Sequence, residues 1–178
     1  ISLAAEAIRL VHQWLPAALA DPGDLKARYQ LCYAAMQAGV AFDNGLLHFT
    51  HALEHPLSAV SPDLSHGLGL AVLLPAVILE CYTARPDVLA HILAPLAPGL
   101  KGLPDEAPQA AKAVEQWLAS VGVPQKLEDL GVTAADVDKF CDLVEQTPSL
   151  GLLISVAPVE GTRERVARIY NNSLKHMA

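Results

Sequence analysis

Apolar residues recur every three or four positions along most of the chain, and this spacing constrains the fold more than any other feature. On an α-helix such residues share one face, which is buried against other helices. We find no useful length of alternating apolar and polar residues, the pattern of a half-buried strand. The clearest helical faces contain Leu3, Ala7, Leu10, Val11, Trp14, Leu15 and Ala18; Ala110, Ala113, Val114, Trp117, Leu118 and Val121; Val137, Phe140, Cys141 and Val144; and Val166, Ile169, Tyr170 and Leu174. The sequence therefore predicts an all-α fold, a multi-helix bundle of about seven to nine helices.

Capping residues predict where several of these helices begin and end. Asp24 is a suitable N-cap for a helix that we expect to run to about Ala38, with Gly39 available as its terminator. Thr133 begins a capping-box pattern, and Thr162 is placed to cap the last helix. Proline and glycine mark the connections between the helices.

Length and composition limit the class of protein. A chain of 178 residues with 52% apolar and 17% charged residues fits one folded domain, 1–178, rather than a disordered segment. The net charge of −7 argues against nucleic acid as the main partner. The longest apolar run, Gly67–Leu79, contains Pro75 and is shorter than the roughly 20 residues that span a bilayer, so we expect a buried core helix and no membrane contact.

The cysteines and the first residue suggest the setting of the chain. Cys32, Cys81 and Cys141 are far apart, odd in number and within predicted helices, which favours reduced, packed thiols in a cytoplasmic protein. The chain begins at Ile1, already within a helical pattern, and we interpret it as part of a longer protein.

Four of the seven histidines lie between His48 and His66, and this cluster is the main candidate for chemistry. His51 and His55 are four residues apart, so on a helix they project from one face, one turn apart. Two imidazoles at this spacing can bind one metal ion. His66 follows a turn-like segment, as a ligand from a second helix would, whereas for His48 we expect a surface role.

The histidine cluster also has other interpretations. His51 and His55 fit a partly exposed helix face, or core histidines that donate to a carbonyl. A catalytic metal usually has at least three protein ligands. Glu54 points about 100° away from His55 on a helix, and Asp63 lies in the turn, where capping or solvation is its expected role. The apolar helices on either side predict a site from which water is excluded.

The residues around the histidines resemble the iron-containing (group III) alcohol dehydrogenases, the family of lactaldehyde reductase and iron-type methanol dehydrogenase. That family has the motif G-x-x-H-x-x-x-H-P-L-G-A, a short loop, P-H-G, and an apolar A-x-L-L-P-H-V helix. The matching segments are HALEHPLSA at 51–59, SHG at 65–67 and AVLLPAV at 71–77. LPAA at 15–18, DLKAR at 24–28, VGVP at 121–124 and Ile169-Tyr170 extend the match along nearly the whole chain.

The resemblance implies that the chain is the C-terminal metal-binding helical domain of such an enzyme. It implies that His51 and His66 bind Fe²⁺ and that an upstream Asp and His complete the ligand set. His55 would lie beside the nicotinamide and substrate, where it would relay the proton or orient the ring. The N-terminal dinucleotide-binding α/β domain is absent from this sequence. The match has departures: one extra residue separates His51 from His66, Ser65 replaces a proline, and Ala76 replaces a histidine.

The expected function is therefore that of an NAD- or NADP-dependent alcohol dehydrogenase, which interconverts a primary alcohol and its aldehyde with Fe²⁺ as a Lewis acid. Zn²⁺ is the alternative metal, since imidazoles bind several first-row ions. The other hypotheses are a helical domain without activity of its own and a Zn-dependent relative with non-redox chemistry. The expected partners are a small alcohol or aldehyde and further copies of the protein, with a dimer as the default.

Overall fold

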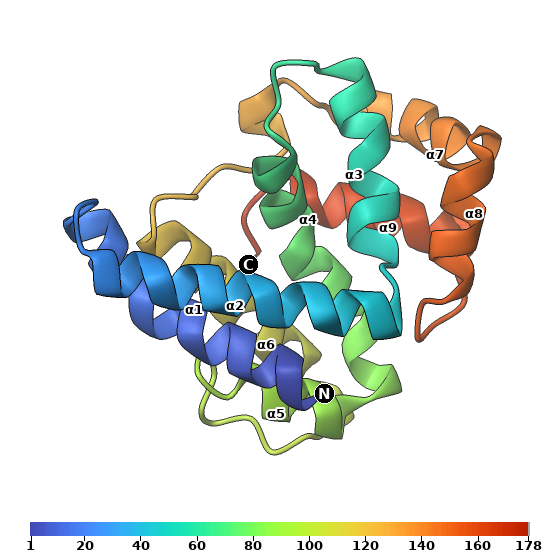
Figure 1. Cartoon of the computed structure of the whole chain (residues 1–178). Helices are drawn as coiled ribbons and strands as arrows, with labels where there is room; N and C mark the ends of the chain where they lie inside the picture. The colour runs from blue at the N-terminus through green and yellow to red at the C-terminus, as the bar shows by residue number, and fades with distance from the viewer. Residues whose placement is uncertain (178) are drawn as a thin grey trace.

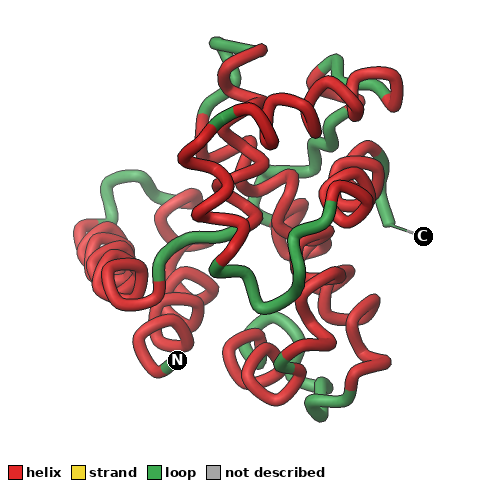
Figure 2. The backbone as a smooth tube through the Cα atoms, turned by 90° about the vertical axis from the view of Figure 1, so that its right-hand side faces the viewer, coloured by secondary structure: helices red, strands yellow, loops and turns green. Residues whose placement is uncertain are grey.

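The computed structural model describes residues 1–177, which form helices, turns and loops without a β-strand. Figure 2 shows the backbone with its helices in red and its loops and turns in green. The α-helices within this range are α1 (Ser2–Ala20), α2 (Leu25–Gly45), α3 (Phe49–Val60), α4 (His66–Cys81), α5 (Pro86–Leu93), α6 (Ala107–Ser120), α7 (Val137–Gln146), α8 (Pro148–Ser155) and α9 (Arg163–Leu174). Short 3-10 turns lie at Tyr82–Ala84, Pro104–Glu106, Glu128–Leu130 and Ala134–Asp136. The all-α prediction is confirmed, at the upper end of the expected number of helices.

Two groups of helices share α4 (Figure 1). α3, α7, α8 and α9 pack around one apolar core, to which α4 contributes Leu73 and Val77. α5 and α6 pack around a second core, to which α4 contributes Ile78. The α1–α2 hairpin contacts the second group through α1 and α5. Because α4 packs on both sides, it is apolar around its circumference, which explains the run of apolar residues in the sequence.

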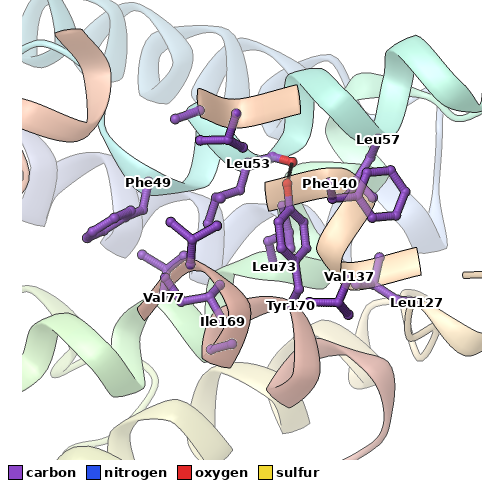
Figure 3. Packing of buried hydrophobic residues seen from close by; sticks show 14 of the residues in the cluster. Phe49, Leu53, Leu57, Leu73, Val77, Leu127, Val137, Phe140, Ile169 and Tyr170 are labelled. Carbon is purple, nitrogen blue, oxygen red and sulfur yellow. Dashed lines mark hydrogen bonds between the residues drawn. The ribbon is translucent and has the colours of Figure 1, made fainter. Parts of the chain in front are cut away.

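A buried hydrogen bond joins α9 to the helix that carries the histidine pair. The Tyr170 hydroxyl donates to the Leu53 carbonyl oxygen at 2.7 Å, and both residues are fully buried. Figure 3 shows this contact among the apolar side chains of the first core. The ring of Tyr170 packs against Phe140 of α7, with ring centres 5.4 Å apart. α3 is therefore held in place by its contacts with α7 and α9.

Three predicted caps are confirmed. The Asp24 carboxylate accepts from the backbone N–H groups of Lys26 and Ala27 at 2.9 and 3.0 Å. The Thr162 hydroxyl accepts from the Arg165 N–H at 3.3 Å. Thr133 forms its capping box at a 3-10 turn that leads directly into α7. The first two caps pair N–H groups that the first helical turn leaves without intrahelical partners, and at Thr133 the backbone N–H donates to the Asp136 carboxylate at 2.9 Å.

The predicted end of α2 was wrong. The helix continues through Ala38 and Gly39 and ends at Gly45. A glycine inside a helix costs only about 1 kcal/mol relative to alanine. α2 runs along α1 and buries Ala27 and Ala34 before Gly39, and the small cost of one helical glycine lets the helix continue to Gly45.

The apolar helical segment formed by α4 and the turn after it is longer than the run Gly67–Leu79 noted in the sequence. Together with the following 3-10 turn, His66–Ala84 makes 19 residues of mean hydropathy 1.8, which is enough by length and composition to cross a membrane. Half of this segment is buried inside the fold. Core helices pass the same test, and the contacts of α4 with both cores agree with the predicted core helix.

Candidate metal centre

The first two predicted site residues lie one turn apart on α3. His51 is partly buried and His55 is exposed, whereas Leu53 between them points into the core. This arrangement follows from the helical period, because residues four apart share a face and a residue two positions on points away. Pro56 follows His55 within the helix and is buried.

The third predicted residue, His66, is the first residue of α4. Ser65 is the N-cap of this helix, and its hydroxyl accepts from the Leu68 N–H at 3.4 Å. The ring centre of His66 lies 5.4 Å from that of His51 and 6.0 Å from that of His55. The structure thus brings the three histidines together where α3 packs against the first turn of α4.

The surroundings of His51 favour its neutral form. Burial lowers the pKa of His51, and the neighbouring imidazoles of His66 and His55 lower it further. A neutral imidazole has a free ring nitrogen and is the form that binds a metal ion. The cluster therefore presents a nitrogen ligand at neutral pH without needing a metal to displace a proton from His51.

The separation of His51 and His66 fits two ligands of one ion. Two imidazoles bound to a tetrahedral ion through nitrogens at about 2.0 to 2.1 Å have ring centres about 5 Å apart. The observed 5.4 Å is close to that separation. Residues 1–177 contain no group of three or more His, Cys, Asp or Glu side chains that could hold an ion by themselves. Asp63, in the turn between α3 and α4, is exposed. The described residues can therefore supply two imidazoles to an ion, with other coordination positions left open.

The cluster is open to solvent on the surface of this chain, contrary to the expected exclusion of water. His55 is exposed, and about half of the His66 side chain is accessible. Both imidazoles are therefore accessible to a small molecule or to another protein surface. The apolar flanks of α3 and α4 lie beneath the histidines and form the first core rather than covering them.

The sequence reasoning missed the contact between Glu54 and His66. Glu54 is fully buried, its Oε2 contacts Nδ1 of His66, and its Oε1 accepts from the Ser58 hydroxyl. Glu54 does point away from His55, as predicted, and in that direction it meets His66 in the first turn of α4. The sequence signal for this contact was a carboxylate next to Leu53 and one helical turn from Leu57, because a carboxylate buried among apolar residues needs a partner.

His48 is not the surface residue that we expected. It is partly buried, and its Nδ1 is the one buried side-chain nitrogen or oxygen without a hydrogen-bond partner within residues 1–177. Burial lowers the pKa of His48. The imidazole borders an apolar cavity of about 720 Å³ between the α1–α2 hairpin and α4, α5 and α6. His51, His55 and His66 do not line this cavity, which is therefore separate from the histidine cluster.

Comparison with known proteins places this geometry in one family. Residues 2–174 match the model of the Fe-containing alcohol dehydrogenase family, C-terminal. The long-chain primary alcohol dehydrogenase AdhA of Thermoanaerobacter ethanolicus is 53% identical over 97% of this chain and 43% of that protein. The 1,3-propanediol dehydrogenase of Citrobacter freundii is 36% identical over 96% of this chain and 43% of that protein.

Solved structures agree in fold. An alcohol dehydrogenase from Oenococcus oeni superposes with a TM-score of 0.83 at 30% identity, over 97% of this chain and 44% of that one. The chain thus spans less than half the length of the relatives that it matches. Its helices match the part of the family that the C-terminal model describes. The chain belongs to the Fe-containing alcohol dehydrogenase family, as the helical C-terminal domain.

Proposed function

We propose that the protein containing this chain is a metal-dependent alcohol dehydrogenase that interconverts a primary alcohol and its aldehyde with NAD or NADP. The observation that carries the proposal is the meeting of His51, His55 and His66, with ring centres 5.4 and 6.0 Å apart. Family membership supports the reaction class. Two relatives are named for primary alcohols, a long-chain alcohol and 1,3-propanediol, which supports the substrate class.

In this proposal His51 and His66 hold Fe²⁺, with Zn²⁺ as the alternative. When bound, the ion supplies Lewis-acid polarisation of the alcohol or aldehyde oxygen. The protein positions the two ligands. α3, which packs on the first core, carries His51, and the Ser65 cap fixes the start of α4, where His66 lies. Two ligands from different helices define where an ion binds relative to the protein surface.

His55 has a different role in the proposal. It is exposed beside both ligands, one turn beyond His51, and its ring centre is 6.0 Å from that of His66. An imidazole takes up or releases a proton at a ring nitrogen near neutral pH. We assign to His55 the transfer of the hydroxyl proton of the substrate or the orientation of the nicotinamide, because it faces solvent where these groups can approach.

The test is alcohol-dependent reduction of NAD or NADP by the full-length protein reconstituted with Fe²⁺. His51→Ala and His66→Ala should each abolish turnover and weaken metal binding. His55→Ala should retain the metal and lose turnover. His91→Ala is the matched control, since this histidine lies on α5, outside the cluster. Unchanged rates in the first two variants would contradict the proposal.

A second candidate function is a helical domain that has no activity without the rest of the protein. It is supported by the absence of a group of three metal-binding side chains within residues 1–177. Oxidation of alcohols by the isolated chain with added Fe²⁺ would exclude it. A Zn-dependent relative with non-redox chemistry is the third candidate, and product analysis with Zn²⁺ and Fe²⁺ separates it from the first.

We further propose that the protein works in the cytoplasm, as a homo-oligomer, on a small alcohol or aldehyde rather than on nucleic acid or a membrane. The net charge of −7 supports the exclusion of nucleic acid. Cys32, Cys81 and Cys141 are free, which supports a reducing compartment. Sedimentation of the full-length protein and fractionation of cells that produce it are the direct measurements.

A further inference from the structure

Glu54 is the one fully buried carboxylate described in residues 1–177, and it lies directly beneath His66. Both of its oxygens have partners: Oε2 contacts His66 Nδ1, and Oε1 accepts from the hydroxyl of Ser58, one turn further along α3. A carboxylate in an apolar interior is costly unless it is paired and hydrogen-bonded. The site therefore consists of a buried anion whose partner is the exposed ring of His66.

The space for this carboxylate is provided by a glycine on the same turn of α4 as His66. A Cβ atom at Gly69 would lie 2.8 Å from Glu54 Cγ and 2.9 Å from its Oε1. Contacts this close do not occur in real structures, so any other residue at 69 would displace the carboxylate. Gly69 is three residues after His66, and residues at that spacing share a helix face. The first turn of α4 thus supplies both the ring and the room for its partner.

The contact determines which nitrogen of His66 is available. A carboxylate only accepts hydrogen bonds, so Nδ1 carries the proton that is donated to Glu54. The lone pair of a neutral His66 is then on Nε2, the nitrogen remote from Glu54. A metal-binding histidine commonly donates its other ring N–H to a carboxylate, which fixes the tautomer and the ring orientation and strengthens the ligand.

Glu54 itself is not placed as a ligand. Its side chain is fully buried, whereas about half of the His66 side chain is accessible to solvent. Its two oxygens already contact Ser58 and His66. The imidazole therefore lies between the carboxylate and the surface on which the histidines meet.

We propose that Glu54 is a positioning residue that holds His66 as the Nδ1–H tautomer, with Nε2 directed to the metal, and that Gly69 is required because it makes room for the carboxylate. This inference rests on the proposed function, since it concerns the same metal site. It adds a residue that acts through His66 and touches neither the substrate nor the cofactor.

The first test measures Co²⁺ binding to the metal-free full-length protein, by calorimetry and by the visible absorption of the bound ion. Glu54→Gln removes the charge, and its amide can donate as well as accept, so it no longer imposes one tautomer. We expect Co²⁺ to bind about 10- to 100-fold more weakly and with an altered spectrum. Gly69→Ala should weaken binding in the same direction. Asp63→Asn, which removes an exposed carboxylate from the adjoining turn, should leave both the affinity and the spectrum unchanged.

The His66→Ala variant separates the inference from the function on which it rests. If His66→Ala weakens Co²⁺ binding but Glu54→Gln binds Co²⁺ with the affinity and spectrum of the wild type, the role of Glu54 is refuted and the metal site stands. If His66→Ala leaves Co²⁺ binding unchanged, the metal site itself is wrong. Circular dichroism and the melting temperature of each metal-free variant show whether it is folded.

A second test needs no variant. Long-range ¹H–¹⁵N spectra of the metal-free wild-type protein, recorded at a pH where histidines are neutral, distinguish the two tautomers of each ring. We expect His66 to be protonated on Nδ1, with Nε2 unprotonated. His66 protonated on Nε2 would overturn the inference, even if Glu54→Gln does not fold.

Discussion

Leu46 has a backbone conformation in which the Leu46→Gly variant should be more stable than Leu46→Ala. At most positions the alanine variant is the more stable of the two. It follows the last residue of α2 and precedes the helix of the histidine pair, with φ 59° and ψ 176°. It is the one non-glycine residue with positive φ within residues 1–177. Its N–H donates to the Phe42 carbonyl at 2.8 Å, and its side chain is 51% exposed.

The magnitude follows from two opposing effects. A non-glycine residue in this region of φ and ψ is strained by about 1 to 3 kcal/mol. Glycine loses more conformational freedom on folding, which costs about 0.5 to 1 kcal/mol relative to alanine. Leu46→Gly and Leu46→Ala lose nearly the same buried side-chain area, so this loss cancels in the comparison. Leu46→Gly should therefore unfold with a free energy about 1 kcal/mol higher than Leu46→Ala.

Urea unfolding of the two variants, followed by circular dichroism, gives this difference from the midpoints if the slope m is the same in both. Met36, 55% exposed within α2, is the matched control position. There Met36→Gly should be less stable than Met36→Ala by about 1 kcal/mol. The reasoning about Leu46 is refuted if Leu46→Ala is as stable as Leu46→Gly or more stable, while Met36 shows its ordinary order.

Three further predictions concern charges and thiols elsewhere in the fold. Arg168 and Arg165 of α9 donate hydrogen bonds to Glu80 and lower its pKa below the ordinary value of 4.5. The stability that this carboxylate contributes is therefore present above about pH 4.5 and is lost as the pH falls through the lowered pKa. Glu80→Gln should lower the free energy of unfolding at pH 7 by about 1 kcal/mol, and by less at pH 3, in urea titrations; equal losses at both values would contradict this. Lys126→Met removes the ammonium partner of the buried Glu115 carboxylate, which keeps the Met177 N–H and the His176 ring as partners, and should cost about 1 to 3 kcal/mol of unfolding free energy. Adding Glu115→Leu should recover much of the loss. In the native protein, iodoacetamide at pH 8 should modify the exposed Cys32, and mass spectrometry should find Cys81 unmodified because burial raises its pKa to about 11.

The local features of the fold could be predicted from the sequence because they depend on near neighbours. The helical faces and the caps at Asp24 and Thr162 were correct, since the residues that form each of these lie within a turn or two of one another. His51 and His55 were placed on one face by the same period. The predicted end of α2 was wrong because one glycine inside a helix costs too little by itself to end it.

The sequence alone determined that this chain is helical and that His51, His55 and His66 are its candidates for metal chemistry. Only the tertiary structure decided what lies behind His66. The packing of α4 on α3 places Glu54 against Nδ1 of His66 and leaves room for it at Gly69. Such a contact joins residues on two helices whose relative position depends on the buried cores, and helical periodicity specifies direction only within a single helix.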